Sequence, residues 1–195
     1  MPDKKLVRLF YALELADNLK ESIRALIFPY SNSSSAIKWI KPENLHLTLR
    51  FLGNVSDNTV PVLVSILESI AMEEKSFLIS LRNTGVFPSL RKPSVLWIGI
   101  DKGAGECKKI STVLNNRLTE IGLTEESRIF KPHITIGRSK KNVPPQHLAH
   151  LYERIIKESA DRFIGACQMD SILLIKSTLT REGPIYTTVA KSYFK

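Results

Sequence analysis

Two of the four histidines in this chain stand in the same short pattern, in which a threonine follows the histidine two residues later. The first copy reads LHLTL over residues 45–49, and the second reads PHITI over residues 132–136. Given how few threonines the chain has, two such histidines out of four arise by chance in roughly 2% of cases, which is low for so short a motif. The repetition therefore singles out His46, Thr48, His133 and Thr135 as candidate functional residues.

These four side chains suit the cleavage of a phosphodiester. Imidazole has a pKa of about 6.5, so one histidine can serve as a neutral base while another serves as a protonated acid. Threonine hydroxyls can donate hydrogen bonds to the non-bridging oxygens of a phosphate, where negative charge develops. A metal site is a weaker hypothesis, because no cysteine or acidic residue near either motif gives a third ligand at metal-site spacing. We therefore expect neither a metal nor a cofactor.

The first motif lies in a run that alternates like a half-buried β-strand, in which successive side chains point to opposite faces. Alternation predicts a core-facing row of Leu45, Leu47, Leu49 and Phe51. The opposite face then carries His46, Thr48 and Arg50. Arg50 is accordingly one candidate for phosphate binding.

The second motif has the same alternation. Ile134 and Ile136 are expected to face the core, while His133 and Thr135 face away from it. Simple alternation puts Arg138 on the core side, so Arg138 would have to turn toward the histidine face at the end of the strand.

The motifs sit among alternating helical and strand-like segments. Four apolar stripes at helical spacing predict helices around residues 19–27, 60–70, 110–121 and 148–155, with Pro61 in the first turn of the second and Gly122 ending the third. Strand-like runs cover residues 6–13, 45–52, 77–81, 95–100, 129–138, 171–175 and 185–190. This order predicts an α+β or mixed α/β fold, and the similarity of the two halves suggests a duplicated unit.

Composition narrows the class of protein. The chain has 195 residues, 28 basic and 19 acidic, with a formal net charge of +9. This length suits a single domain over residues 1–195, and the basic balance favours a polyanionic partner such as RNA. We read no membrane-spanning run and no signal peptide, and the two cysteines lie too far apart in sequence for metal or redox spacing. We therefore expect a cytoplasmic protein.

Other candidate residues have simpler explanations. His147 and His150 fall on one predicted helix face, where they are expected to meet solvent. Met72 and Phe163 are interpreted as packing residues. The remaining aromatic candidates could either pack or stack on bases: Phe87, Trp97 and Tyr186.

Beyond the two motifs, the chain resembles the RNA 2′,3′-cyclic phosphodiesterases, also called 2′-5′ RNA ligases, of the two-histidine phosphoesterase superfamily. The resemblance runs nearly from end to end. It is carried by RLF at 8–10, ALE at 12–14, Trp39, KPENLHLTLRFLG at 41–53, GVFP at 85–88, Pro93, VLWIG at 95–99, FKPHITIGR at 130–138, Leu179, Gly183-Pro184 and Tyr186.

The resemblance implies a bilobal α+β fold with two antiparallel sheets lining a central groove, helices outside and lobes related by a pseudo-twofold axis. It implies metal-independent hydrolysis of an RNA 2′,3′-cyclic phosphate end to a 2′-phosphomonoester. The resemblance also implies that the same site can join tRNA halves reversibly through a 2′-5′ linkage without ATP. It implies that Thr48 and Thr135 hold the phosphate. We favour His46 as the proton donor and His133 as the proton acceptor, and the pseudo-symmetry of the two motifs leaves the reverse assignment open. Arg138 is the next phosphate contact by resemblance, with Arg50 as its competitor.

Three alternatives stay open from sequence. The protein could be a phosphodiesterase that acts on small cyclic-phosphate nucleotides or 2′-5′ oligonucleotides. It could be an RNA- or nucleotide-binding module that keeps the groove without turnover, or a structural α+β protein with accidental histidines. A monomer is expected by default.

Overall fold

The protein is described here by a computed structural model that covers residues 5–31, 36–124, 129–141, 143–181 and 183–195. The prediction that there is no signal peptide rests on the first residues of the sequence. Residues 1–4 lie outside the described residues. Helices and strands follow the order β1 (Leu6–Glu14), α1 (Asp17–Ser31), β2 (Ile37–Trp39), β3 (His46–Ser56), α2 (Val60–Glu73), β4 (Phe77–Phe87), β5 (Val95–Ile100), α3 (Ala104–Glu120), β6 (His133–Ser139), α4 (Pro145–Glu158), β7 (Phe163–Met169), β8 (Ser171–Leu179) and β9 (Pro184–Tyr193). Single 3-10 turns precede β3 (Pro42–Asn44) and α2 (Asp57–Thr59).

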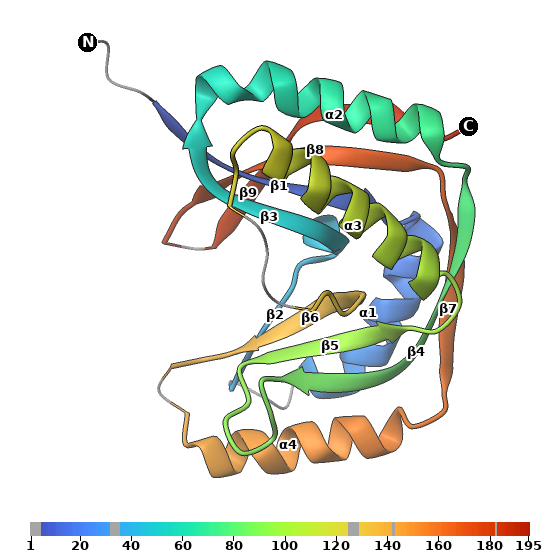
Figure 1. Ribbon diagram of the computed structural model, residues 1–195. Helices are drawn as coiled ribbons and strands as arrows, with labels where there is room; N and C mark the ends of the chain where they lie inside the picture. The colour runs from blue at the N-terminus through green and yellow to red at the C-terminus, as the bar shows by residue number, and fades with distance from the viewer. Residues whose placement is uncertain (1–4, 32–35, 125–128, 142, 182) are drawn as a thin grey trace.

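The strands form one curled antiparallel sheet in the order β7-β4-β5-β6-β3-β1-β8-β9, and β2 adds to β6. Two half-sheets can be distinguished within it, because β3 and β6 pair at one position, Leu47 with Ile134. The upper lobe in Figure 1 holds β3, β1, β8 and β9 beneath α2 and α3, while the lower lobe holds β6, β5 and β4 above α4. The predicted bilobal α+β architecture is confirmed.

The strand order is matched on the two sides of the β3–β6 junction. After each histidine strand the chain crosses to the opposite lobe. β3 and α2 are followed by β4, which pairs with β5 in the lower lobe. β6 and α4 are followed by β7, which pairs with β4 in the same lobe, and then by β8, which pairs with β1 in the upper lobe. The two lobes are therefore built from exchanged segments, and neither is a continuous stretch of chain.

The predicted helices are present, and their apolar stripes face the sheet. The stripe of α1 is buried along its length, and its Leu19 contacts β7 at Gly165, where an added Cβ would lie 2.8 Å from Leu19 Cδ1. Pro61 does lie in the first turn of α2. Two packing expectations were wrong, because Met72 is 61% exposed and Phe163 is 57% exposed. Both lie on outer surfaces where no further layer covers them among the described residues.

Several strands differ from their predicted extents. β4 runs on past Leu81 to Phe87, and β2 and β7 were not expected. β6 begins at His133 rather than at Ile129, which is 88% exposed. Small and polar residues interrupt the hydrophobic pattern of β4 and β7, and two of them are glycines that neighbouring side chains approach closely, Gly85 beneath Trp97 and Gly165 beside Leu19.

Two apolar clusters stabilise the lobes. The main core lies between the sheet and the helices. A smaller cluster lies on the groove face of the upper lobe and comprises Phe10, Ala12, Leu173 and Ile175, with Tyr186 packed against it. This smaller cluster forms a rigid apolar floor next to the first motif.

Candidate active site

The two His-x-Thr motifs meet at the junction between the half-sheets. The pairing of Leu47 with Ile134 joins the central residues of the two motifs. Because the strands run antiparallel, His46 lies toward the Thr135 side of the junction and Thr48 lies toward the His133 side. The predicted grouping of these four residues around one groove agrees with this geometry, and all four line the groove.

A β-bulge follows the threonine in each motif. In β3, Tyr11 and Ala12 of β1 pair with Arg50 and Thr48, which leaves Leu49 as the extra residue. In β6, Leu96 and Trp97 of β5 pair with Gly137 and Thr135, which leaves Ile136 as the extra residue. A bulge interrupts the alternation of side chains, so the residues after it change face.

The carbonyl groups of both bulged residues are hydrogen-bonded. Ser111 Oγ of α3 donates to Leu49 O at 2.9 Å, and the Ile40 amide beside β2 donates to Ile136 O at 2.9 Å. An extra residue in a strand has no regular ladder partner, so these two donors satisfy groups that would otherwise be costly to bury. α3 and the segment around β2 therefore stabilise the two bulges.

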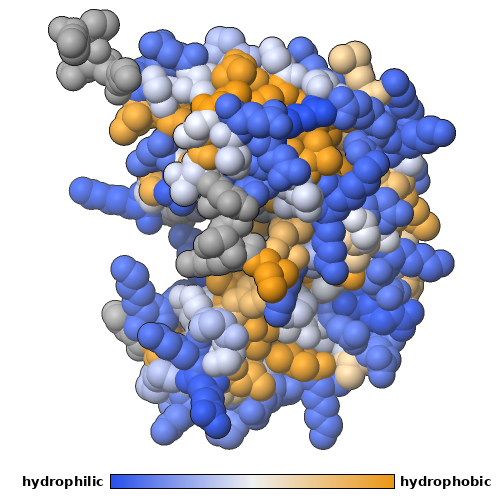
Figure 2. All heavy atoms as spheres, in the orientation of Figure 1, coloured by the Kyte–Doolittle hydropathy of each residue, from blue (hydrophilic) through white to orange (hydrophobic). Residues whose placement is uncertain are grey.

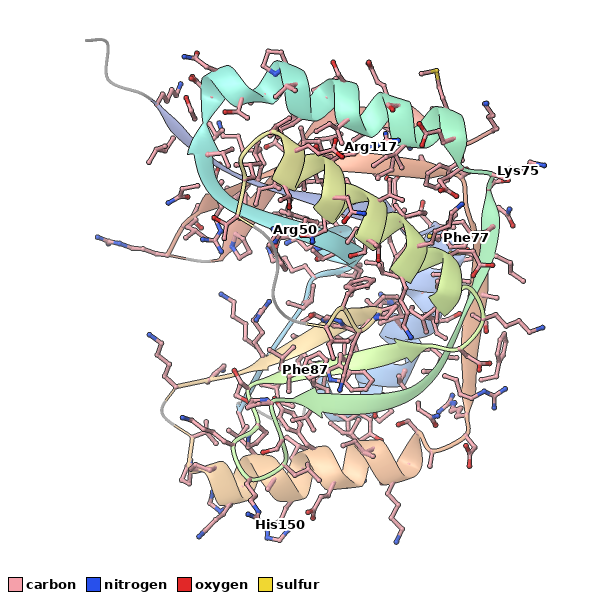
Figure 3. The ribbon with its side chains drawn as sticks, in the orientation of Figure 1. Arg50, Lys75, Phe77, Phe87, Arg117 and His150 are labelled. Carbon is pink, nitrogen blue, oxygen red and sulfur yellow. The ribbon has the colours of Figure 1, made fainter. Side chains whose placement is uncertain are left out.

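The bulge at Leu49 overturns the expectation for Arg50. The Arg50 side chain borders the groove but is buried, with 9% of it exposed. Nη1 donates to Phe51 O at 3.0 Å and Nη2 donates to Thr124 O at 2.5 Å. Figure 3 shows Arg50 between β3 and the segment that follows α3. Arg50 is thus engaged with backbone carbonyls, and its expected role in phosphate binding does not fit this geometry.

The same bulge corrects the expectation for Phe51. Phe51 was expected in the core, yet it is 51% exposed and packs against Phe10 at a ring-centroid distance of 5.5 Å. An exposed aromatic ring therefore lies on the His46 side of the groove, in the place that alternation gave to Arg50.

The bulge at Ile136 has the matching effect on Arg138. Ile136 and Gly137 are both buried, and the alternation resumes with an exposed Arg138 that lines the groove. The positive charge of Arg138 lowers the pKa of both His46 and His133. Arg138 thus reaches the histidine face, although the turn is made by the bulge and not by the strand end.

Each imidazole is fixed by a hydrogen bond from Nδ1. His46 Nδ1 donates to Asn44 O at 2.7 Å, and His133 Nδ1 donates to Lys131 O at 2.7 Å. A carbonyl oxygen can only accept, so Nδ1 carries the hydrogen in both rings and Nε2 of the neutral ring can accept a proton. Thr48 Oγ1 lies 2.9 Å from His46 Nε2. Both histidines are therefore held in the tautomer that a proton-transfer role requires.

Aromatic rings surround each imidazole. The centroid of the His46 ring lies 4.9 Å from that of Phe10 and 5.3 Å from that of Tyr186, and the Tyr186 ring is nearly perpendicular to it. The centroid of the His133 ring lies 5.0 Å from that of Phe87 and 6.4 Å from that of Trp97. The three aromatic residues that the sequence left open between packing and stacking are thus all neighbours of a motif histidine.

Burial lowers the pKa of both histidines. Desolvation is the main cause of a His46 pKa of about 4, and the charges of Arg138 and His133 lower it further, while the hydrogen bond to Asn44 opposes the shift. Desolvation also lowers the pKa of His133, again opposed by a backbone hydrogen bond, here to Lys131. Both rings are therefore mainly neutral at pH 7 in the free protein.

The groove has a volume of about 1470 Å³ and is lined from both lobes. Its charged lining within the described residues is mostly basic, comprising Lys38, Lys41, Lys131 and Arg138 against Glu43, apart from the engaged Arg50. Figure 2 shows hydrophilic side chains projecting from both rims on the open left side. Sequence reasoning did not single out the three lysines as groove residues, although Lys41 and Lys131 lie within the blocks that carry the family resemblance.

The remaining histidines lie away from the groove. His147 and His150 are exposed on α4, and His150 Nδ1 lies 3.9 Å from Glu153. Within the described ranges, no three His, Cys, Asp or Glu side chains gather as they would around a metal ion. In the same residues, no helix has the length and apolar composition needed to cross a membrane.

The curled sheet and the mirrored His-x-Thr strands define a two-histidine phosphoesterase, and comparison with known proteins agrees. A family model described as LigT like phosphoesterase matches residues 13–97. A curated RNA 2′,3′-cyclic phosphodiesterase of Aeropyrum pernix is 37% identical over 155 residues, which cover 78% of this chain and 84% of that protein. The Aquifex aeolicus protein of the same name is 32% identical, with 92% and 89% covered. The chain belongs to this family of LigT-like RNA 2′,3′-cyclic phosphodiesterases.

Solved structures show the same fold. The structure of TT0787 from Thermus thermophilus matches with a TM-score of 0.82 at 25% identity, covering 96% of this chain and 97% of that one. Escherichia coli LigT, solved in complex with 3′-AMP, matches with a TM-score of 0.76 at 22% identity, covering 98% and 99%. The likeness extends over both lobes and not only over the motifs.

Proposed function

We propose that this protein hydrolyses the 2′,3′-cyclic phosphate at the end of an RNA strand to a 2′-phosphomonoester, with His46 and His133 as the acid–base pair. The observation that carries the proposal is the antiparallel meeting of the two motifs at Leu47 and Ile134. It brings two imidazoles and two threonine hydroxyls into one groove, where Nε2 of His46 lies 2.9 Å from Thr48 Oγ1 in the free protein. In-line cleavage of a cyclic phosphodiester needs a base and an acid on opposite sides of the phosphorus, and hydrogen-bond donors at the non-bridging oxygens.

In the proposed mechanism, water attacks the phosphorus in line with the 3′ oxygen. One histidine accepts a proton from the water as the new P–O bond forms, and the other donates a proton to the 3′ oxygen as its bond to phosphorus breaks. Thr48 and Thr135 donate hydrogen bonds to the non-bridging oxygens, and Arg138 neutralises their charge. The product retains the phosphate on the 2′ oxygen.

We propose His133 as the base and His46 as the acid. His46 must then be protonated in the substrate complex, although its pKa is about 4 in the free protein. The negative charge of the bound phosphate raises the pKa of a neighbouring imidazole and so supplies this change. A substrate with sulfur in place of the 3′ oxygen tests the assignment, because a thiolate leaves without protonation. His46→Ala is expected to retain far more activity on that substrate than His133→Ala, and the reverse pattern would exchange the roles.

The proposed reaction needs no metal. The acid, the base and the charge-neutralising donors are all side chains of the groove, and the described residues offer no cluster of metal ligands there. The protein is proposed to act as a cytoplasmic monomer.

An RNA end is the proposed substrate, supported by the basic lining of the groove and by the names of the relatives. The exposed ring of Phe51 offers a stacking surface for a base near His46. The test compares a short RNA with a 2′,3′-cyclic phosphate end against a nucleoside 2′,3′-cyclic phosphate and a 2′-5′-linked dinucleotide. The RNA is expected to give the highest kcat/KM and a 2′-phosphate product. Preference for the small nucleotides would favour the small-molecule alternative, and salt-dependent RNA binding without turnover would favour a binding module.

Reversible 2′-5′ ligation is a further part of the proposal. A 5′-hydroxyl that replaces water at the same phosphorus would join two strands, such as tRNA halves, through a 2′-5′ linkage without ATP, and the base and the acid would keep the roles they have in hydrolysis. Microscopic reversibility requires them to exchange roles when the 3′-hydroxyl attacks the 2′-5′ linkage and re-forms the cyclic phosphate. Incubation of tRNA halves with the protein, followed by analysis of the linkage, tests it.

A further inference from the structure

The residues of the GVFP block at 85–88 and of the VLWIG block at 95–99 take no direct part in the proposed chemistry. Two strands of the lower lobe carry them, β4 and β5. In the strand register, Trp97 pairs with Gly85 on one side and with Thr135 on the other. Gly99 pairs with His133. Both blocks therefore lie directly beside the second motif.

The indole of Trp97 fills the space above Gly85. A methyl group at Gly85 would lie 2.2 Å from Cζ2 and 2.4 Å from Cη2 of Trp97. At Gly99, an added Cβ would lie 3.0 Å from Arg82 O and 3.5 Å from Trp97 Cζ3. An indole is rigid, so a side chain at Gly85 would have to displace the whole ring. Residue 85 must therefore be glycine if the Trp97 indole is to keep its position.

Phe87 lies between Trp97 and His133 and contacts both rings. Its ring packs on Trp97 at 5.1 Å with an interplanar angle of 33°. It then meets the His133 imidazole at 5.0 Å and 87°, in an edge-to-face arrangement. Figure 3 places Phe87 in the lower lobe, at the groove. Gly85, Trp97, Phe87 and His133 thus form one continuous stack.

His133 has particular need of such support. Within the described part of the chain, the ring makes one hydrogen bond, from Nδ1 to Lys131 O, whereas both nitrogens of His46 have a partner. A single hydrogen bond leaves the ring plane poorly defined, because the last torsion of a histidine side chain has a broad energy profile. An aromatic edge against the ring restricts that torsion.

We propose that Gly85, Trp97 and Phe87 form a layered support that sets the plane of the His133 imidazole, so that Phe87 and Trp97 are positioning residues for the proposed reaction. Neither ring has a group that could exchange a proton with substrate. Their contribution is to aim Nε2 of His133 at the groove and to keep water from the outer face of the ring.

The test uses Phe87→Leu, which removes the ring edge, and Gly85→Ala, which displaces the indole. Phe87→Tyr keeps the ring and serves as the conservative variant. Gly105→Ala is the matched glycine control, because an added Cβ there would meet nothing within 4 Å beyond its chain neighbours and the backbone of its own helix. Circular dichroism and thermal unfolding identify variants that do not fold. If Gly85→Ala does not fold, Phe87→Leu decides alone, since it adds no volume.

Two readouts are compared: kcat and KM on the cyclic-phosphate RNA, and NMR titration of both imidazoles. For Phe87→Leu, we expect kcat to fall about tenfold or more with KM within about twofold, since a small misplacement of a reacting group has a large kinetic cost. The pKa of His133 should rise toward its ordinary value while that of His46 stays unchanged. Arg138 and His46, the charged and titratable groups facing His133, are intact in these variants. Phe87→Tyr should restore both readouts.

The inference is overturned if folded Phe87→Leu keeps the wild-type His133 titration and kcat, or if both histidines shift equally, which would indicate general loosening. The inference rests on the proposed function only for its kinetic readout. If the wild-type protein does not hydrolyse the cyclic phosphate, the proposed function fails, and the NMR titration still decides whether the stack sets His133.

Discussion

At the residue scale, the two arginines that sequence reasoning left in competition have separate tasks. Arg138 lies in the groove, where its charge reaches both motif histidines. Arg50 is buried and donates to the carbonyls of Phe51 and Thr124. One arginine therefore lines the groove beside both histidines, where we propose that it binds the phosphate, and the other ties β3 to Thr124 in the segment after α3.

Replacement of Arg138 should weaken phosphate binding without unfolding the protein. In Arg138→Gln, a charge-assisted hydrogen bond to phosphate is lost, so KM for the cyclic-phosphate RNA should rise by about tenfold or more. The pKa of His46 and of His133 should both rise in the free protein, because a nearby positive charge is removed. Steady-state kinetics and NMR titration measure the two effects. Unchanged KM and unchanged titrations would remove Arg138 from the site.

Replacement of Arg50 should lower the stability of the protein and leave KM nearly unchanged. Arg50→Met leaves two carbonyls without their charged donor, so the free energy of unfolding should fall by about 2–3 kcal/mol. KM should stay within about twofold for the folded protein. Chemical denaturation and kinetics on the same samples separate stability from binding. A large rise in KM with full stability would restore the alternation-based assignment.

At the element scale, the strands position the site through their irregularities. Alternation correctly predicted that each histidine shares a face with its threonine, because only two residues separate them. It was wrong for Arg50 and Phe51, since the bulge at Leu49 lies between them and Thr48. The partners that satisfy the bulges, Ser111 and Ile40, come from distant segments. A local sequence pattern does not indicate contacts between distant segments, so the two bulges and the residues that they reorient could not be predicted from sequence.

The hydrogen bond to the Leu49 bulge should be measurable. Ser111→Ala removes a buried donor and leaves Leu49 O unpartnered, which should lower the free energy of unfolding by about 1–3 kcal/mol. Thr119→Ala is the control, because the exposed Thr119 hydroxyl donates to Asn115 O of its own helix, and the substitution should change stability by about 0.5 kcal/mol or less. Equal effects of the two substitutions would mean that α3 does not stabilise the bulge.

At the scale of the whole molecule, two lobes built from exchanged segments hold one groove between them. Periodicity predicted the four helices and most strands, because their apolar faces are long and regular. It did not predict β7, where Gly165 makes room for Leu19 of α1, nor the second half of β4, where Gly85 makes room for Trp97. The crossing of β4 and β8 between lobes depends on pairing over long sequence distances. The bilobal architecture was therefore reached through the family resemblance and not through the pattern.

The buried His46 should link the stability of the whole molecule to pH. Its pKa is about 4 in the folded protein and about 6.5 in an unfolded chain. Between these values the unfolded chain binds more protons, so the free energy of unfolding must fall as pH decreases from about 6.5 to about 4, by up to about 3 kcal/mol. Urea denaturation at several pH values should show a shallower dependence for His46→Gln than for wild type. His150→Gln, whose side chain is 84% exposed, should behave like wild type.

The central claim is that two histidines on mirrored strands cleave a cyclic phosphate as an acid–base pair without a metal. The most direct test incubates a short RNA with a 2′,3′-cyclic phosphate end in EDTA with wild type, His46→Ala and His133→Ala. Wild type should yield a 2′-phosphate, and each variant should lose activity by about 10²-fold or more while it still folds. Activity that depends on added metal, or that survives the loss of either histidine, would contradict the account.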